Sequence, residues 1–218
     1  MQARKFLSNC SFGRDSEVIA ALDSGFDVNT TIRGATGLHF ACSHNRASIV
    51  QTLLRAEGIN INFRDRFGRS ALDFACMQQN TKIVTILVKI PSIEINAINN
   101  RGETALFIAA GRCPASIPIL VEHGIDIEVK ANNGMSALQS ALCVADSSIL
   151  RQMERGKLSV QALVNFGCNL SETDRQNQHV INSLEINAAQ RETCRQAFRG
   201  MHWLPSVQKE LILDFLYL

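Results

Sequence analysis

The seven cysteines are the residues of this 218-residue chain best suited to metal binding or nucleophilic chemistry. They stand at positions 10, 42, 76, 113, 143, 168 and 194, mostly about thirty residues apart, and no two form a Cys-x-x-Cys pair. A zinc site or a disulfide framework requires closer clusters. The spacing therefore predicts small buried apolar side chains in a reducing compartment, and hence a cytoplasmic or nuclear protein.

Other residues with catalytic potential form no recognisable motif. The sequence has no glycine-rich phosphate loop, no His-Glu-x-x-His motif and no Gly-x-Ser-x-Gly elbow. The aspartates are scattered over positions typical of solvated turns or caps, and the histidines lack ligand spacing; these residues are Asp73, Asp126, Asp174, His44, His123, His179 and His202. We therefore expect no catalytic residue, no metal ion and no cofactor, and a protein that is not an enzyme.

Composition and charge argue against several further classes of protein. The chain is 46% hydrophobic, which argues against disorder. Lys plus Arg exceed Asp plus Glu by 22 − 20 = 2, so no strong basic field favours nucleic acid. No apolar run reaches the roughly 18 residues needed to span a membrane, and the N-terminus lacks the apolar core of a signal peptide. Nucleic acid and membranes are therefore not expected as partners.

A repeated signature, Gly-x-Thr/Ser-small-Leu-x-x-Ala, organises the elements that position the polar residues. It begins at Gly34, Gly68, Gly102 and Gly134, with intervals of 34, 34 and 32 residues. The glycine suits a turn with positive φ, and the Thr or Ser can cap a following helix. Leu and Ala, three residues apart, then share one face of that helix. We expect Leu72 and Leu106 to lie in the core.

A second helix is predicted after each signature, from apolar residues spaced three or four apart. These helices include Ile49–Leu54, Ile83–Val88 and Ile117–Val121, and alternating exits such as Ile59-Asn-Ile-Asn62 follow them. Asn62 and Asn96 are expected to bond the turn backbone. Upstream, residues 4–12 and 16–22 match one further, degenerate helix pair. Short pairs of this kind cannot bury their apolar faces alone, so the sequence predicts a stacked solenoid.

The signature resembles that of the ankyrin repeat, whose Thr-Pro-Leu-His motif appears as Thr36-Gly-Leu38-His39. The proline is absent, and His39 becomes Asp73, Phe107 and Gln139 in later units. The resemblance implies an all-α ankyrin-repeat solenoid of helix-turn-helix units with hairpin turns, and a structural role for His39. Residues 1–33 would form a degenerate N-terminal repeat, 34–183 the repeats with a degenerate fifth near 177, and 184–218 a short helical segment. About nine extra residues are expected within 145–156.

Ankyrin arrays offer a concave groove to protein partners, and the turn tips here are rich in arginine. Arginine beside an exposed aromatic residue is typical of binding hot spots, and Phe67 stands between Arg66 and Arg69. The positive bias favours a client with an acidic segment. The predicted groove residues are Arg64, Arg66, Phe67, Asp73, Met77, Asn99, Arg101, Phe107, Lys130 and Asn132.

The C-terminal segment carries a second resemblance. Cys194-Arg195-x-x-Phe198, then Leu204-Pro205, resembles a suppressor-of-cytokine-signalling (SOCS) box, although Gln190 and Thr193 replace expected leucines. This resemblance implies docking to elongin B and C and a cullin ubiquitin ligase. An F-box-like docking segment and a plain cap on the array are the alternatives. The implied docking residues are Cys194, Phe198, Leu204, Pro205, Leu213 and Leu216.

Overall fold

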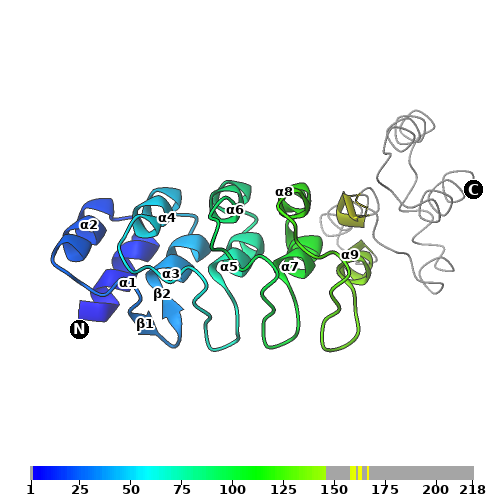
Figure 1. The fold of residues 1–218 in the computed structure, drawn as a ribbon, viewed down its shortest axis with the longest axis horizontal. Coiled ribbons are helices and arrows are strands. Elements are labelled where there is room, and N and C mark those ends of the chain that lie inside the picture. The colour runs from blue at the N-terminus through cyan, green and yellow to red at the C-terminus, as the bar shows by residue number, and fades with distance from the viewer. Residues whose placement is uncertain (1, 146–157, 161, 164–165, 167–218) are drawn as a thin grey trace, which may run out of the picture.

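The computed structural model describes residues 2–145, 158–160, 162, 163 and 166. Their helices stack in pairs: a row of first helices lies beside a row of second helices, and the connecting loops project to one side (Figure 1). The pairs are α1 (Gln2–Phe12) with α2 (Asp15–Asp23), α3 (Gly37–Ser43) with α4 (Ala47–Leu54), α5 (Ala71–Met77) with α6 (Thr81–Val88), and α7 (Ala105–Arg112) with α8 (Ile117–Glu122); α9 (Ala137–Ala145) follows. The predicted helical solenoid is confirmed.

Each first helix after α1 begins at the Thr or Ser of the signature. Ser70 and Thr104 accept hydrogen bonds from the backbone N–H three residues later, at 3.2 and 3.4 Å. These caps satisfy N–H groups that the first helical turn would otherwise leave without a partner. The second helices begin less regularly: Pro114 opens a short 3-10 turn (Pro114–Ser116) ahead of α8, where the missing N–H of proline costs little.

The side chain three positions after the cap residue accepts a hydrogen bond from the backbone N–H of the cap residue in three of the units. His39 Nδ1 lies 3.1 Å from the Thr36 N–H, and His39 Nε2 lies 3.1 Å from the Arg69 carbonyl of the next unit. Since both the Thr36 amide and its hydroxyl face Nδ1, we assign the proton to Nε2. In later units Asp73 and Gln139 accept from the N–H of their caps, at 2.8 and 3.0 Å. The structural role of His39 is confirmed.

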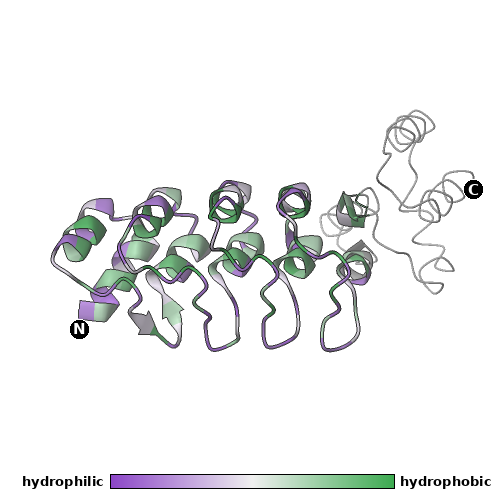
Figure 2. Cartoon of the chain, viewed as in Figure 1, coloured by the Kyte–Doolittle hydropathy of each residue, from purple (hydrophilic) through white to green (hydrophobic). Residues whose placement is uncertain are grey.

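The core consists of equivalent positions repeated along the stack. The signature leucines and alanines are almost fully buried, as are the Ile and Leu pairs of the second helices, and Figure 2 shows hydrophobic residues concentrated on the helices. Four cysteines, Cys10, Cys42, Cys76 and Cys113, are free and buried, as predicted for them. Burial raises the pKa of the Cys10 thiol to about 12, which keeps it protonated and unreactive.

Hairpin turns connect each second helix to the next first helix. The first hairpin pairs β1 (Thr31–Ile32) with β2 (Ala35–Thr36) in antiparallel register. Later hairpins are closed by short backbone bonds, as from the Asp65 N–H to the Arg69 carbonyl at 3.0 Å and from the Gly68 N–H to the Asp65 carbonyl at 2.9 Å. Asn62, as predicted, bonds the turn backbone: its amide donates to the Ser92 carbonyl at 2.7 Å and its Oδ1 accepts from Glu94 N–H at 2.9 Å.

The predicted insertion at 145–156, the degenerate fifth repeat near 177 and the segment 184–218 with its docking residues lie outside the described residues, apart from Ala145 at the end of α9. Within the described part of the chain, no helix is long and apolar enough to cross a membrane.

Candidate partner-binding groove

A groove of about 740 Å³ runs between the projecting hairpins and the first helices in the middle of the array. Hairpins 65–69 and 99–103 form one wall, and α5, α7 and α9 form the other. Aromatic, aliphatic and thioether side chains share the lining with guanidinium groups, a composition typical of protein-binding hot spots. The lining residues are Phe67, Arg69, Met77, Asn99, Asn100, Arg101, Glu103, Phe107, Ile108, Gly111, Arg112 and Ser140.

A stack of alternating arginine and aromatic side chains borders this groove. The Arg66 and Arg69 guanidinium carbons lie 4.5 and 4.8 Å from the centre of the Phe67 ring. Arg69 also lies 4.5 Å from the centre of the Phe74 ring. These cation–π contacts hold Phe67 in place although 46% of it is exposed. An aromatic side chain is thus ordered at the surface before any partner arrives.

A buried carboxylate fixes the hairpin that carries Phe67. Asp65 Oδ1 accepts from the Phe67 and Arg69 N–H groups at 2.8 and 2.9 Å, and Oδ2 accepts from Arg69 Nε and Nη2 at 2.9 and 2.6 Å. Burial alone would raise the pKa of Asp65, but the bonds from Arg69 and from these amides outweigh it and lower the pKa. Asp65 is therefore ionised at neutral pH and holds Arg69 over both rings.

Backbone bonds join the hairpin tips into a continuous ledge. The Asn100 N–H donates to the Phe67 carbonyl at 3.0 Å, and the Asn132 N–H donates to the Arg101 carbonyl at 2.8 Å. The two asparagine side chains reinforce this ladder by donating to the Arg66 and Asn100 carbonyls at 3.2 and 3.0 Å. The tips therefore keep fixed positions relative to one another.

Half of the predicted groove residues line the groove: Phe67, Met77, Asn99, Arg101 and Phe107. Arg66 stands beside it in the stack on Phe67. Asn99 is largely buried, because its Oδ1 accepts from the Arg101 and Glu103 N–H groups. It therefore shapes the turn more than it offers a surface.

The remaining predicted groove residues lie elsewhere. Asp73 is only 1% exposed, so its predicted place in the groove is wrong, whereas its expected role as a cap is confirmed, because it accepts from the Ser70 N–H at the start of α5. Arg64 points away from the groove, where it bonds the Ile98 carbonyl and forms an ion pair with Glu94 at 3.0 Å. Lys130 and Asn132 are exposed on the next hairpin, beyond the lining.

Several lining residues were not predicted, and helical spacing could have found some of them. Gly111 follows Phe107 by four positions and Arg112 follows Ile108 by four, so these pairs share one side of α7. No salt bridge or hydrogen bond engages the Arg112 guanidinium among the described residues, whereas Arg101 lies 4.0 Å from Glu103. The groove therefore offers unneutralised positive charge.

The described residues show no cluster of His, Cys, Asp or Glu that could hold a metal ion. With its open shape and its mixture of arginine and apolar side chains, the groove is suited to binding a polypeptide segment rather than to proton transfer.

Comparison with known proteins identifies the repeats. Residues 7–99 match the family model described as ankyrin repeats (3 copies). This part of the chain is an ankyrin-repeat array, and such arrays are protein-binding scaffolds. The same helix pairing continues beyond the matched residues in α7 and α8, and α9 packs on α7 in turn. No curated protein matches the chain significantly. The comparisons identified no catalytic family and give no support for a SOCS box.

Proposed function

We propose that this protein binds an extended, acidic segment of a client protein in the groove beside Phe67. The observation that carries the proposal is the stack of Arg66, Phe67 and Arg69, which presents an ordered aromatic ring between two guanidinium groups, of which Arg66 has no carboxylate partner among the described residues. An apolar client side chain would pack against Phe67 and Phe107, and client carboxylates would face Arg101 and Arg112. Preformed geometry supports affinity, because little side-chain entropy remains to be lost on binding.

Selection of a random peptide library on the full chain tests this proposal. We expect enrichment of sequences in which Asp or Glu flank an apolar residue. Enriched peptides should bind Phe67→Ala and Arg112→Ala variants about ten-fold more weakly, as is usual for hot-spot truncations. Ile98→Ala is the matched control, because Ile98 is 48% exposed but lies outside the groove. Peptides that bind all three variants equally, or that carry no acidic residues, would refute the proposal.

A ligase-adaptor role is the second candidate, and it is supported only by the resemblance of residues 184–218 to a SOCS box. In this role the array would hold the client while Cys194, Phe198 and Leu204-Pro205 bind elongin B and C and thereby a cullin. Co-expression of the full chain with elongin B and C should give a complex that Cys194→Asp and Phe198→Asp abolish. Absence of a complex would favour an F-box-like segment, if a Skp-type adaptor co-purifies, or a plain scaffold whose tail caps the array.

A further inference from the structure

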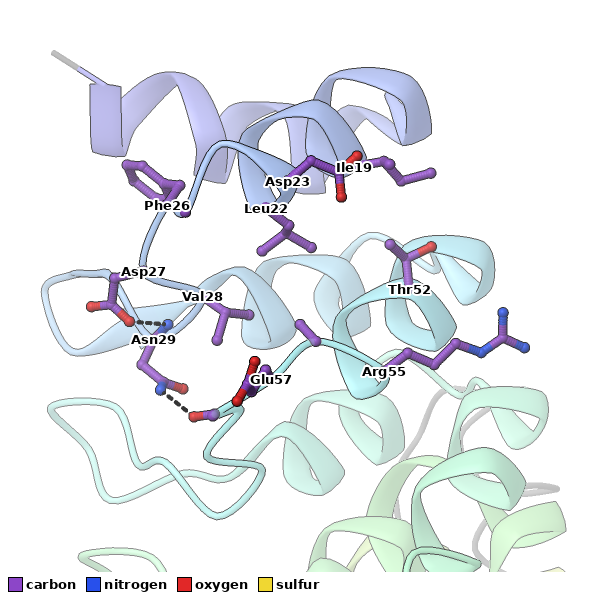
Figure 3. Close-up of a pocket in the computed structure, with 13 residues that line it drawn as sticks. Ile19, Leu22, Asp23, Phe26, Asp27, Val28, Asn29, Thr52, Arg55 and Glu57 are labelled. Carbon is purple, nitrogen blue, oxygen red and sulfur yellow. Dashed lines mark hydrogen bonds between the residues drawn. The ribbon is translucent and has the colours of Figure 1, made fainter.

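A second cavity of about 620 Å³ lies between α2 and α4, and it shares no lining residue with the groove. Its floor is apolar and comes from α2, from the exit that follows it and from the end of α4 (Figure 3). Ile19 at its edge is 43% exposed, so its side chain is available to a partner together with the apolar floor. The apolar lining residues are Ile19, Leu22, Phe26, Val28 and Ala56.

The rim of this cleft is acidic. Asp23, Asp27 and Glu57 line it together with one basic residue, Arg55. No salt bridge neutralises these three carboxylates within the described part of the chain. Figure 3 shows the Arg55 side chain extending away from Asp27 and Glu57. Residues 15–29 contain four acidic residues and no Lys or Arg, although Arg14 and Lys5 act on Glu17 at the start of α2, away from the rim.

Hydrogen bonds hold the two walls of the cleft at a fixed separation. The Asn29 amide donates to the Gly58 carbonyl at 2.7 Å, and Asn29 Oδ1 accepts from the Asn60 N–H at 2.8 Å. Asp27 Oδ1 accepts from the Asn29 N–H at 2.9 Å, which fixes the turn that carries it. Phe26, on the floor, packs against Phe6 of α1 with ring centres 4.8 Å apart. The cleft is therefore preformed.

We propose that the cleft between α2 and α4 is a second docking site, which takes a partner-protein segment with an apolar side chain flanked by lysine or arginine. The apolar floor and Ile19 would cover the apolar side chain, and the three unpaired carboxylates would face the flanking cations. The same carboxylates repel acidic segments, so this cleft and the groove beside Phe67 select partners of opposite charge. The cleft does not depend on the function proposed for the groove.

Fluorescence anisotropy with a labelled peptide tests the site on the full chain. The probe is Lys-Lys-Leu-Phe-Lys-Lys, and the comparison peptide replaces Leu-Phe with Ser-Ser. We expect the first peptide to bind more tightly, and we expect binding to weaken by about five-fold or more in Ile19→Ser and in Asp23→Asn/Glu57→Gln, since these variants remove the apolar contact and the negative charges that the peptide would meet. Raising the salt concentration should weaken it as well, because exposed charges are screened.

Matched variants make the outcome decisive. Ile98→Ser removes an equally exposed apolar group elsewhere, and Glu122→Gln/Asp126→Asn removes two exposed charges near the end of α8; both should leave binding unchanged. Phe67→Ala should do the same. The proposal is overturned if the two peptides bind equally, if the Ile19 and Asp23/Glu57 variants bind like the native chain, or if sedimentation shows that Ile19→Ser dissociates a dimer, which would make a second copy the occupant.

Discussion

At the scale of single residues, the residue three positions after each helix cap differs in type from one unit to the next. His39 links its own cap to the carbonyl of the next unit, because its ring has two polar atoms. Asp73 makes only the first of these bonds, and its Oδ1 is buried without a hydrogen-bond partner. The aspartate thus retains the cap and loses the link between units, at the cost of a desolvated oxygen.

Asp73 should give the protein a pH-dependent stability. Burial is the largest effect on its pKa and raises it from 3.8 to about 6, against opposing bonds from Ser70 and the charges of Arg64 and Arg69. Between these two values the folded state binds the Asp73 proton and the unfolded state does not, so the contribution of Asp73 to the free energy of unfolding falls as the pH rises from 3.8 to about 6. The full effect is about 3 kcal/mol at most for a shift of this size.

Urea unfolding of the native chain and of Asp73→Asn at pH 4.5, 5.5 and 7 measures this contribution. The variant keeps an oxygen that accepts from the Ser70 N–H, and it has no proton to lose. The stability of the variant relative to the native chain should therefore increase from pH 4.5 through 5.5 to 7, because the native chain alone loses the contribution of the Asp73 proton. Asp126→Asn, at an exposed turn, serves as the control. Parallel curves for the native chain and Asp73→Asn would contradict the prediction.

At the scale of elements, the short helices depend on their neighbours. The helices α3, α5 and α7 have seven or eight residues each, too few to be stable alone in water. Their signature leucines are buried against the helices on either side. Leu72→Ala and Leu106→Ala should each lower the free energy of unfolding by about 2–5 kcal/mol, the cost of a cavity in a packed core. Ile98→Ala should change it by less than about 0.5 kcal/mol in the same denaturation measurement.

Two glycines, Gly58 in the exit after α4 and Gly68 at a hairpin tip, are required for separable reasons. Gly58 and Gly68 both have positive φ, +72° and +74°. A Cβ at Gly58 meets nothing within 4 Å, whereas one at Gly68 would lie 2.9 Å from the Asn100 nitrogen that bonds the Phe67 carbonyl. Gly58→Ala should therefore cost about 1 kcal/mol, from backbone strain alone. Gly68→Ala should cost about 2 kcal/mol or more, since the ladder between tips must also shift.

Thermal or urea unfolding of these two variants separates the effects. Client binding offers a second measurement, because displacement of the ledge at Gly68 should weaken peptides selected on the groove, whereas the Gly58 variant should bind them normally. Equal losses of stability in both variants would mean that the ladder adds nothing to the conformational requirement for glycine.

Local sequence signals predicted the elements well, because each signal and its consequence lie within one unit. Thr36 and Ser70 mark helix starts, and Leu38 and Ala41 mark the buried face, whatever the neighbouring unit contains. Two kinds of feature were missed. The burial of Asp73 depends on how closely adjacent units pack, and the cleft between α2 and α4 depends on the spacing of exits about thirty residues apart in sequence. Both features depend on how one unit packs against the next, which the sequence of a single repeat does not determine.

At the scale of the whole molecule, two surfaces of opposite charge occupy different parts of one rigid stack. The groove beside Phe67 lies on the side of the hairpins and first helices, and the acidic cleft lies between the second helices near the N-terminus. The net charge of +2 is therefore a sum over a positive groove and a negative cleft on different parts of the array. Since the surfaces share no residue, a variant that changes one should leave the other intact, which is the basis for the control experiments above.

Because each helix pair contacts only its neighbours, a destabilising substitution should lower the stability of the nearby helices only. In the array α7 packs against α5, α8 and α9, and α1 packs against α2 and α3. We expect Leu106→Ala to increase amide hydrogen exchange strongly in α5, α7, α8 and α9, with little change in α1 to α3, because stability in such arrays is a sum of unit and interface contributions. Hydrogen exchange followed by mass spectrometry measures each helix separately. A uniform increase along residues 2–145 would instead show that the array unfolds as one cooperative block, in which case the two binding surfaces would also be coupled in stability.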